Sequence, residues 1–191
     1  MANAGTYSRQ HMTLAPSQIE TARLTLRPMD LEKDLDRWLQ LRMNPEVQRF
    51  IGTIVHTDRQ VALEETETKK QKGDFKFFYT VTVKEDTDPD EMIGLVIMRP
   101  MEDGKTVEVG YWLLPDYWGQ GYATEAASAV CRACPDAMGF PASDISAHVM
   151  VGNHASRRVL EKSGLKVTST GPVDLPNGGQ ADVWWLNWAQ E

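Results

Sequence analysis

The segment from Thr106 to about Ala137 constrains the fold of this chain more than any other part of its sequence. Apolar and polar residues alternate from Thr106 to Leu113, which is typical of a half-buried β-strand. A loop with Gly119 and Gly121 follows, and the alanine-rich run from Thr124 onwards predicts a helix that packs closely on a sheet. The fold must therefore bring a strand end, a glycine loop and a helix start together.

The other apolar patterns predict a mixed sheet with helices on both faces, because meandering strands precede a strand–helix–strand crossover. A length of 191 residues suits one domain. We expect residues 1–18 to form a flexible N-terminal tail and residues 19–191 to form that single domain. The expected strands cover 22–29, 75–84, 92–99, 106–113, 144–151, 165–170 and 181–188, and the expected helices cover 31–43, 58–72, 124–137 and 153–163.

The net charge of -7 argues against a nucleic acid partner, because phosphate contacts need clustered lysine and arginine. It is compatible with a cationic amine substrate, but acidity for solubility alone explains it as well. No apolar run approaches the ~18 residues of a membrane span, and the N-terminus has no secretory core, so we expect a cytoplasmic protein without a membrane partner. Cys131 and Cys134 have no second cysteine pair, which favours two free thiols over a metal site.

The glycine loop before the predicted helix is a candidate anion site. The first N–H groups of a helix lack intrahelical partners, and the helix dipole attracts negative charge. Small residues at Gly119, Gly121 and Ala123 would let a phosphate approach the main chain. No lysine follows as in a Walker loop, and three predicted strands precede the loop, unlike in a Rossmann fingerprint. From these residues alone, a purely structural turn remains an equal alternative.

Four segments carry a resemblance to a known family: 20–27, 109–126, 153–156 with 159–165, and the last strand pair. Together they resemble the GNAT superfamily of acyl-CoA acyltransferases, and within it the ribosomal-protein N-terminal acetyltransferases of the RimJ/RimL type. The resemblance covers residues 19–188. Trp118 stands where the general family pattern has Gln or Arg, but tryptophan is usual there in this branch.

The resemblance implies an α/β GNAT fold of the α+β kind, with a mostly antiparallel seven-stranded sheet and about four helices. The fourth and fifth strands of this fold splay apart, and the pantetheine arm of acetyl-CoA lies between them. The pyrophosphate would bind N–H groups of the loop, and the thioester carbonyl would lie near Tyr111 or Trp112. The expected acetyl-CoA contacts are Tyr111, Trp112, Leu113, Trp118, Gly119, Gln120, Gly121, Tyr122, Ala123, Thr124, Asn153 and Ser156.

The resemblance also implies direct attack of a neutral amine on the thioester. Glu108 is the candidate base, through water, although a cross-strand structural glutamate is the alternative. Ser156 is the candidate acid for the leaving sulfur. Asn153 is also a candidate catalytic residue beside the cofactor; a helix cap is the alternative, and one asparagine could do both. Arg157, Arg158 and Lys162 could face the 3′-phosphate of CoA or only solvent.

The resemblance therefore implies an N-acetyltransferase that uses acetyl-CoA and no metal. The acceptor is a primary amine, with a protein N-terminus, an amino acid and a small amine left open. A non-catalytic acyl-CoA-binding module and an unrelated nucleotide-binding domain are the alternatives, and both monomer and homodimer remain open. The acceptor side is expected near the first two helices, the loop containing Phe50, Ile51 and His56, and the last strand pair with Trp184, Trp185 and Trp188.

Overall fold

A computed structural model describes residues 16–51, 56–175 and 178–189. The expected N-terminal tail lies outside the described residues except for 16–18. Of these, Pro16 accepts a hydrogen bond of 3.1 Å at its carbonyl from the Tyr79 hydroxyl.

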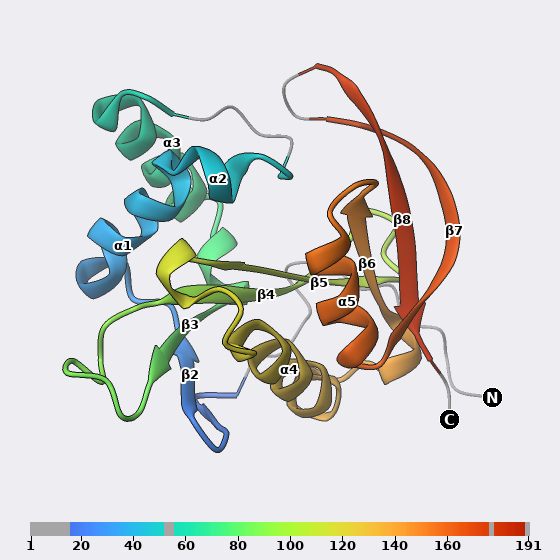
Figure 1. Cartoon of the computed structure of the whole chain (residues 1–191), viewed down its shortest axis with the longest axis horizontal. Coiled ribbons are helices and arrows are strands. Elements are labelled where there is room, and N and C mark those ends of the chain that lie inside the picture. The colour runs from blue at the N-terminus through green and yellow to red at the C-terminus, as the bar shows by residue number, and fades with distance from the viewer. Residues whose placement is uncertain (1–15, 52–55, 176–177, 190–191) are drawn as a thin grey trace.

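Eight strands form one sheet in the order β1-β2-β3-β4-β5-β6-β8-β7, in which only β5 and β6 pair in parallel (Figure 1). Seven were predicted, and the additional one is β1, two residues too short to leave a periodic pattern. The strands are β1 Ile19–Glu20, β2 Leu24–Pro28, β3 Phe78–Val83, β4 Gly94–Pro100, β5 Val107–Leu113, β6 Ile145–Met150, β7 Leu165–Asp174 and β8 Gln180–Trp188.

The β5 and β6 strands diverge, as expected for a GNAT fold. Within the described residues, they pair only at Val107 with Ile145 and at Glu108 with Ser146. The β5 strand nevertheless continues to Leu113, and it stays paired with β4 over its whole length. The side of β5 that faces β6 is therefore without a strand partner after Glu108.

The described residues contain five α-helices, one more than predicted: α1 Leu31–Met43, α2 Pro45–Gln48, α3 Arg59–Gln71, α4 Tyr122–Met138 and α5 His154–Lys162. The additional α2 arises because Asn44 ends α1 and then caps a new turn, its Oδ1 accepting from the Glu46 N–H at 2.9 Å.

Several predicted boundaries differ from the structure by two to four residues, among them the starts of β3 and α4 and the end of β7. Residues Asp74–Phe77 form a 3-10 turn, so β3 begins at Phe78 rather than at residue 75. The buried aromatic rings of Phe75 and Phe77 gave this turn the appearance of a strand. The α4 helix also begins two residues before the predicted position, directly after Gly121.

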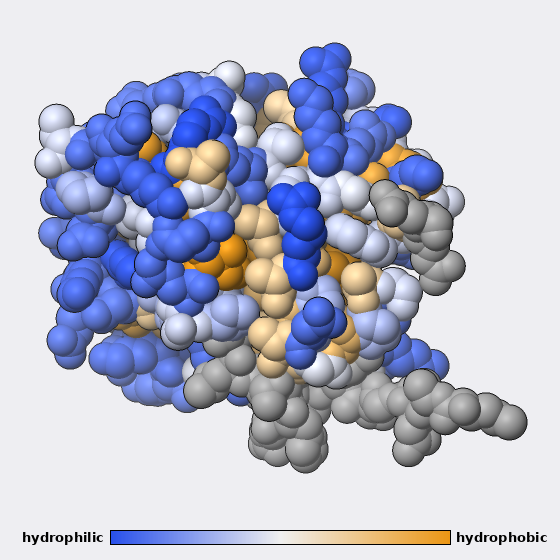
Figure 2. Space-filling model, turned by 90° about the horizontal axis from the view of Figure 1, so that it is seen from below, coloured by the Kyte–Doolittle hydropathy of each residue, from blue (hydrophilic) through white to orange (hydrophobic). Residues whose placement is uncertain are grey.

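The helices cover the two faces of the sheet, with α1 to α3 on one side and α4 and α5 on the other (Figure 1). On the first face, the buried ring of Trp38 on α1 stacks on Trp112 of β5 with ring centroids 5.6 Å apart. Seen from below, the surface of the molecule is largely hydrophilic, with apolar side chains gathered near its middle (Figure 2). The two cysteines lie buried in α4 as free thiols, as predicted.

Candidate active site

The loop between β5 and α4 is fixed by its own side chains. The Trp118 Nε1–H donates to the Leu113 carbonyl at 2.8 Å, and the Gln120 amide donates to the Asp116 carbonyl at 2.9 Å. Gly119 and Gly121 have φ angles of 75° and 83°, a left-handed conformation that side chains other than glycine rarely adopt. These contacts turn the chain from the end of β5 directly into a helix.

The start of α4 offers donors for an anion. The first helical hydrogen bond runs from the Glu125 N–H to the Gly121 carbonyl at 3.1 Å. The N–H groups of Tyr122, Ala123 and Thr124 therefore have no intrahelical acceptor, and they carry the positive end of the helix dipole. This donor set fits a pyrophosphate, as the sequence predicted for this loop.

Arg23, which the sequence analysis did not identify, holds the loop and the helix start together. Its Nη1 donates to the Gln120 carbonyl at 3.0 Å, and its Nε donates to Glu125 Oε2 at 2.7 Å. Its guanidinium also lies 4.6 Å from the ring centroid of Tyr122. The second carboxylate oxygen of Glu125 accepts from the Thr21 hydroxyl at 2.6 Å.

These contacts join the segment before β2 to a loop about a hundred residues later, so no local pattern could reveal them. Arg23 lies in the expected strand 22–29, and Glu125 lies in the first turn of the expected helix 124–137. The resemblance included both segments without showing that they meet.

Three of the predicted residues meet on the face of the sheet that α4 and α5 cover. The Asn153 Oδ1 accepts from the Ser156 N–H at 3.1 Å, which confirms the predicted cap of α5. The Ser156 hydroxyl lies beside the Tyr111 phenol of β5. Burial raises the pKa of Tyr111 to about 12, although the neighbouring Ser156 acts in the opposite direction. Two neutral hydroxyl groups therefore lie together beside the diverging strands.

Glu108 is held more tightly than expected for a free base. One oxygen lies 2.9 Å from Nδ1 of His148, and the other accepts from Arg99 at 2.8 Å. Burial alone would raise the pKa of this carboxyl, but the His148 hydrogen bond and the Arg99 charge lower it to about 2. Both carboxylate oxygens therefore have partners, and a carboxylate with a lowered pKa has less affinity for a proton than an ordinary one.

The face of Glu108 also contains the residues expected near an acceptor. The guanidinium of Arg42 lies 5.8 Å from the ring centroid of Trp112 and donates to Glu65 at 2.7 Å. His56 contacts Glu65 as well, so the described residues directly before α3 lie on this face. A Cβ added to Gly110 would meet nothing within 4 Å, so there is open space above the strand at this position.

The tryptophans of β8 divide between the two faces, as their alternation predicted. Trp185 lies opposite His148, with ring centroids 5.5 Å apart. Trp184 instead contacts His154 of α5 with ring centroids 5.2 Å apart. Only Trp185 of these two therefore shares the face of Glu108.

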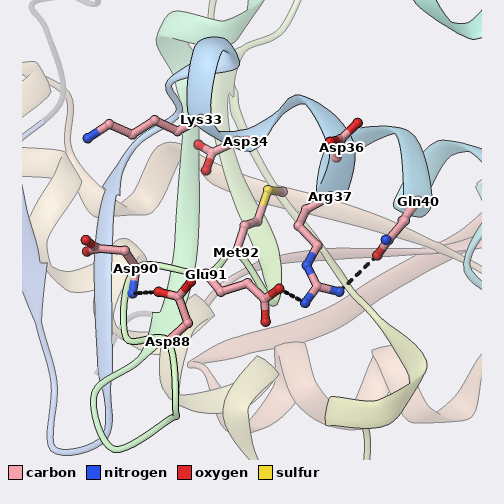
Figure 3. A pocket seen from close by; sticks show the side chains of 9 residues that line it. All are labelled: Lys33, Asp34, Asp36, Arg37, Gln40, Asp88, Asp90, Glu91 and Met92. Atoms are coloured by element: carbon pink, nitrogen blue, oxygen red, sulfur yellow. Dashed lines mark hydrogen bonds and ion pairs between the residues drawn. The ribbon is translucent and has the colours of Figure 1, made fainter.

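A separate cavity of about 510 Å³ lies between α1 and the loop that precedes β4 (Figure 3). Figure 3 shows Arg37 between Gln40 and Glu91, with carboxylates around it. The cavity shares no residue with the β5–α4 loop. Its lining consists of Lys33, Asp34, Asp36, Arg37, Gln40, Asp88, Asp90, Glu91 and Met92.

Over 16–51, 56–175 and 178–189, no group of three or more His, Cys, Asp or Glu side chains could hold a metal ion. None of the helices in these ranges is both long and apolar enough to cross a membrane.

Comparison with known proteins agrees with the fold. The family model described as an acetyltransferase (GNAT) domain matches residues 23–166. The chain is 26% identical over 172 residues to YnaD of Bacillus subtilis, described as an uncharacterized N-acetyltransferase, and the match covers 87% of this chain and 91% of YnaD.

Solved structures share the same architecture. A GNAT-family acetyltransferase from Bacillus anthracis superposes with a TM-score of 0.72 at 21% identity, over 90% of this chain and 98% of that one. A spermidine N-acetyltransferase from Vibrio cholerae, solved with CoA and spermine, gives 0.69 at 18% identity, over 87% and 95%. With the family match covering most of its length, the chain belongs to the GNAT acetyltransferase family.

Proposed function

We propose that this acetyltransferase moves the acetyl group of acetyl-CoA to a primary amine by direct attack within a ternary complex. The observation that carries the proposal is the separation of β5 and β6 after Glu108. The unpaired side of β5 leads at one end to the helix N–H groups of α4, and the hydroxyl groups of Tyr111 and Ser156 lie beside it. An extended thioester with a diphosphate at its far end fits this combination.

The cofactor would be held mainly by main-chain groups. The N–H groups from Gly119 to Thr124 would bind the pyrophosphate, and main-chain groups of Tyr111, Trp112 and Leu113 would bind the pantetheine arm. The Leu113 carbonyl already accepts from Trp118, so Trp118 acts by shaping the loop. Acetyl-CoA supplies the activated acyl group, and the remaining chemistry is proton transfer by residues of this chain.

Ser156 would donate a proton to the leaving sulfur and be reprotonated from solvent. Its neighbour Tyr111 is neutral at physiological pH because burial raises its pKa to about 12. It can therefore orient the serine hydroxyl without introducing a charge. Asn153 would hold the backbone of Ser156 through the cap described above.

The acceptor is proposed at the level of a primary amine on a protein N-terminus, an amino acid or a small compound. The RimJ/RimL-like motifs support the first of these, and the related spermidine N-acetyltransferase fold supports the last. The net charge of -7 is compatible with any cationic acceptor.

The test is a panel of polyamines, amino acids and short peptides with free N-termini, each incubated with acetyl-CoA and followed by thiol release. We expect turnover with at least one class, and mass spectrometry should show one added acetyl group on that amine. Saturable acetyl-CoA binding without thiol release from any class would instead favour a non-catalytic acyl-CoA-binding module. Stabilisation by ATP but not by CoA would overturn both readings.

A further inference from the structure

Glu108 and His148 form a pair that the sequence did not predict. The Nδ1 atom of His148 lies 2.9 Å from Glu108 Oε1, while Arg99 Nε and Nη2 lie 2.8 and 2.7 Å from Oε2. Glu108 is only 8% exposed, whereas the His148 side chain is 38% exposed. The carboxylate is thus buried behind an imidazole that reaches solvent.

The position of the pair in the sheet is specific. Ser146 of β6 is the last residue that pairs with β5, opposite Glu108. His148 lies two residues further along β6, where the strands have begun to separate, and alternation places it on the same face as Ser146 and Glu108. Gly110, two residues beyond Glu108 on β5, shares this face and leaves open space above the strand.

We propose that His148 is a catalytic residue that takes the proton from the acceptor amine, and that Glu108 is the positioning residue that orients it. This inference rests on the proposed function, in which an amine enters from the open face of β5. A carboxylate at Nδ1 favours the tautomer with its proton on that nitrogen. The Nε2 lone pair is then left to accept a proton.

The proton balance of the reaction is consistent with this role. A protonated amine gives one proton to His148 Nε2, and its nitrogen then forms the bond to the acyl carbon as the carbon–sulfur bond breaks. The electron pair of that bond goes to sulfur, which is protonated by Ser156. The nitrogen loses its second proton on forming the amide, so each turnover releases one net proton to solvent.

The contacts around His148 favour this task over a purely structural one. Glu108 on β5 is the charged group that contacts the imidazole, and Arg99 on β4 neutralises that carboxylate from behind. On β8, the Trp185 ring lies 5.5 Å from the imidazole centroid. These neighbours limit rotation of the ring and leave its exposed edge available to a ligand.

The first test compares His148→Gln with His154→Gln, since His154 is an exposed histidine on the opposite face. With the best amine of the panel, His148→Gln should lower kcat/KM at pH 7 by about 100- to 10,000-fold, the usual contribution of a general base. The loss should shrink as the pH approaches the pKa of the amine, which then arrives neutral. His154→Gln should retain wild-type kcat/KM, and both variants should bind acetyl-CoA like the wild type.

A loss from His148→Gln that is the same at every pH would overturn the base role, as would full activity of this variant. Either result leaves the proposed function intact, because the wild type would still transfer acetyl groups. A wild type that acetylates no amine would instead remove the proposed function.

The second test needs no acceptor. Nitrogen-15 NMR of the free protein, recorded where the imidazoles are neutral, should show His148 with its proton on Nδ1 and none on Nε2. Glu108→Gln should weaken this tautomer preference, whereas Ser143→Ala, on an exposed 3-10 turn, should not. A wild-type His148 that carries its proton on Nε2 would overturn the inference.

Discussion

At the scale of single residues, the environment of Glu108 decides its chemistry. Burial would raise the pKa of an isolated carboxyl, but the His148 hydrogen bond and the Arg99 charge lower it to about 2. The contacts with His148 and Arg99 that lower the proton affinity of Glu108 also make it a strong structural anion. Its neighbour His148 is left as the more exposed partner.

This environment predicts a stability that depends on pH. Glu108 has an ordinary pKa of 4.5 and a folded pKa of about 2, so it favours the folded state above pH 4.5 and loses this effect as the pH falls through 2. The difference corresponds to about 3 kcal/mol in the free energy of unfolding. Urea unfolding of the wild type and Glu108→Gln should show this gap at pH 7 and its closure towards pH 2. A gap that does not change with pH would contradict the prediction.

Ser156 gives a second prediction at this scale. Ser156→Ala should lower kcat by about 100-fold while leaving the KM for acetyl-CoA unchanged, since general acid catalysis contributes at least that much. The cap of α5 should survive, because the bond from Asn153 goes to the Ser156 backbone N–H. The exposed Ser143→Ala is the matched control. Unchanged turnover in Ser156→Ala would remove the acid assignment.

At the scale of elements, the β5–α4 loop depends on a neighbour that is remote in sequence. Gly119 and Gly121 allow the turn, but Arg23 fixes it through Gln120 and Glu125. The loop can therefore present its N–H groups in one arrangement before any ligand binds. Such preorganisation reduces the cost of ordering on binding.

Arg23→Gln should raise the KM for acetyl-CoA by about tenfold with a much smaller change in kcat, because a charge-assisted hydrogen bond contributes roughly 1.5–3 kcal/mol. Arg23→Lys should recover part of the loss, since it keeps the charge but not the fork of donors. Arg59→Gln is the control, because Arg59 pairs with the exposed Asp36 on other elements. An equal fall in kcat for a CoA-saturated Arg23→Gln enzyme would contradict a binding role.

Two strand glycines give a matched pair. A Cβ at Gly94 would lie 2.3 Å from the Trp112 carbonyl oxygen, whereas one at Gly110 would meet nothing within 4 Å. Gly94→Ala should therefore lower the free energy of unfolding by about 1–3 kcal/mol through overpacking. Gly110→Ala should not destabilise the fold, which chemical denaturation can check. Equal losses in both variants would show that the close contact at Gly94 is not responsible.

At the scale of the whole molecule, one sheet separates the two halves of the site. The cap of α5 and the Ser156 hydroxyl lie towards one face, and Trp112, Glu108 and His148 lie towards the other. In the described part of the chain, β5 and β6 stop pairing after Glu108, so the gap between them opens towards both faces. A ligand in this gap would contact both halves of the sheet, and so would stabilise the fold as a unit.

Saturating acetyl-CoA should therefore raise the Tm of the full chain. At 100 times its Kd, a ligand that binds only the folded state adds about 2.7 kcal/mol. For a chain of this size, that corresponds to a rise of roughly 5–10 °C in Tm. Differential scanning fluorimetry with CoA and ATP in parallel measures it, and a larger shift with ATP would contradict the assignment of the loop to CoA.

Local patterns predicted the elements well because burial periodicity and caps are local properties. The alternation of 106–113, the helix expected at 31–43 and the cap at Asn153 all appear in the structure. The β1 strand and α2 were missed because two and four residues are too few to form a period. The 3-10 turn at Asp74–Phe77 was misread because buried aromatic rings occur in turns as well as strands.

The sequence by itself determined the order of the elements, the glycine turn into an alanine-rich helix and, by resemblance, the family. These follow from spacing along the chain. Only the tertiary structure decided which side chains meet: Arg23 with Glu125, and Glu108 with Arg99 and His148. The pKa of a carboxylate depends on charges and hydrogen bonds within a few ångströms in space. For Glu108, one of those partners, His148, comes from a strand that follows forty residues later, so its role became visible only once the sheet was assembled.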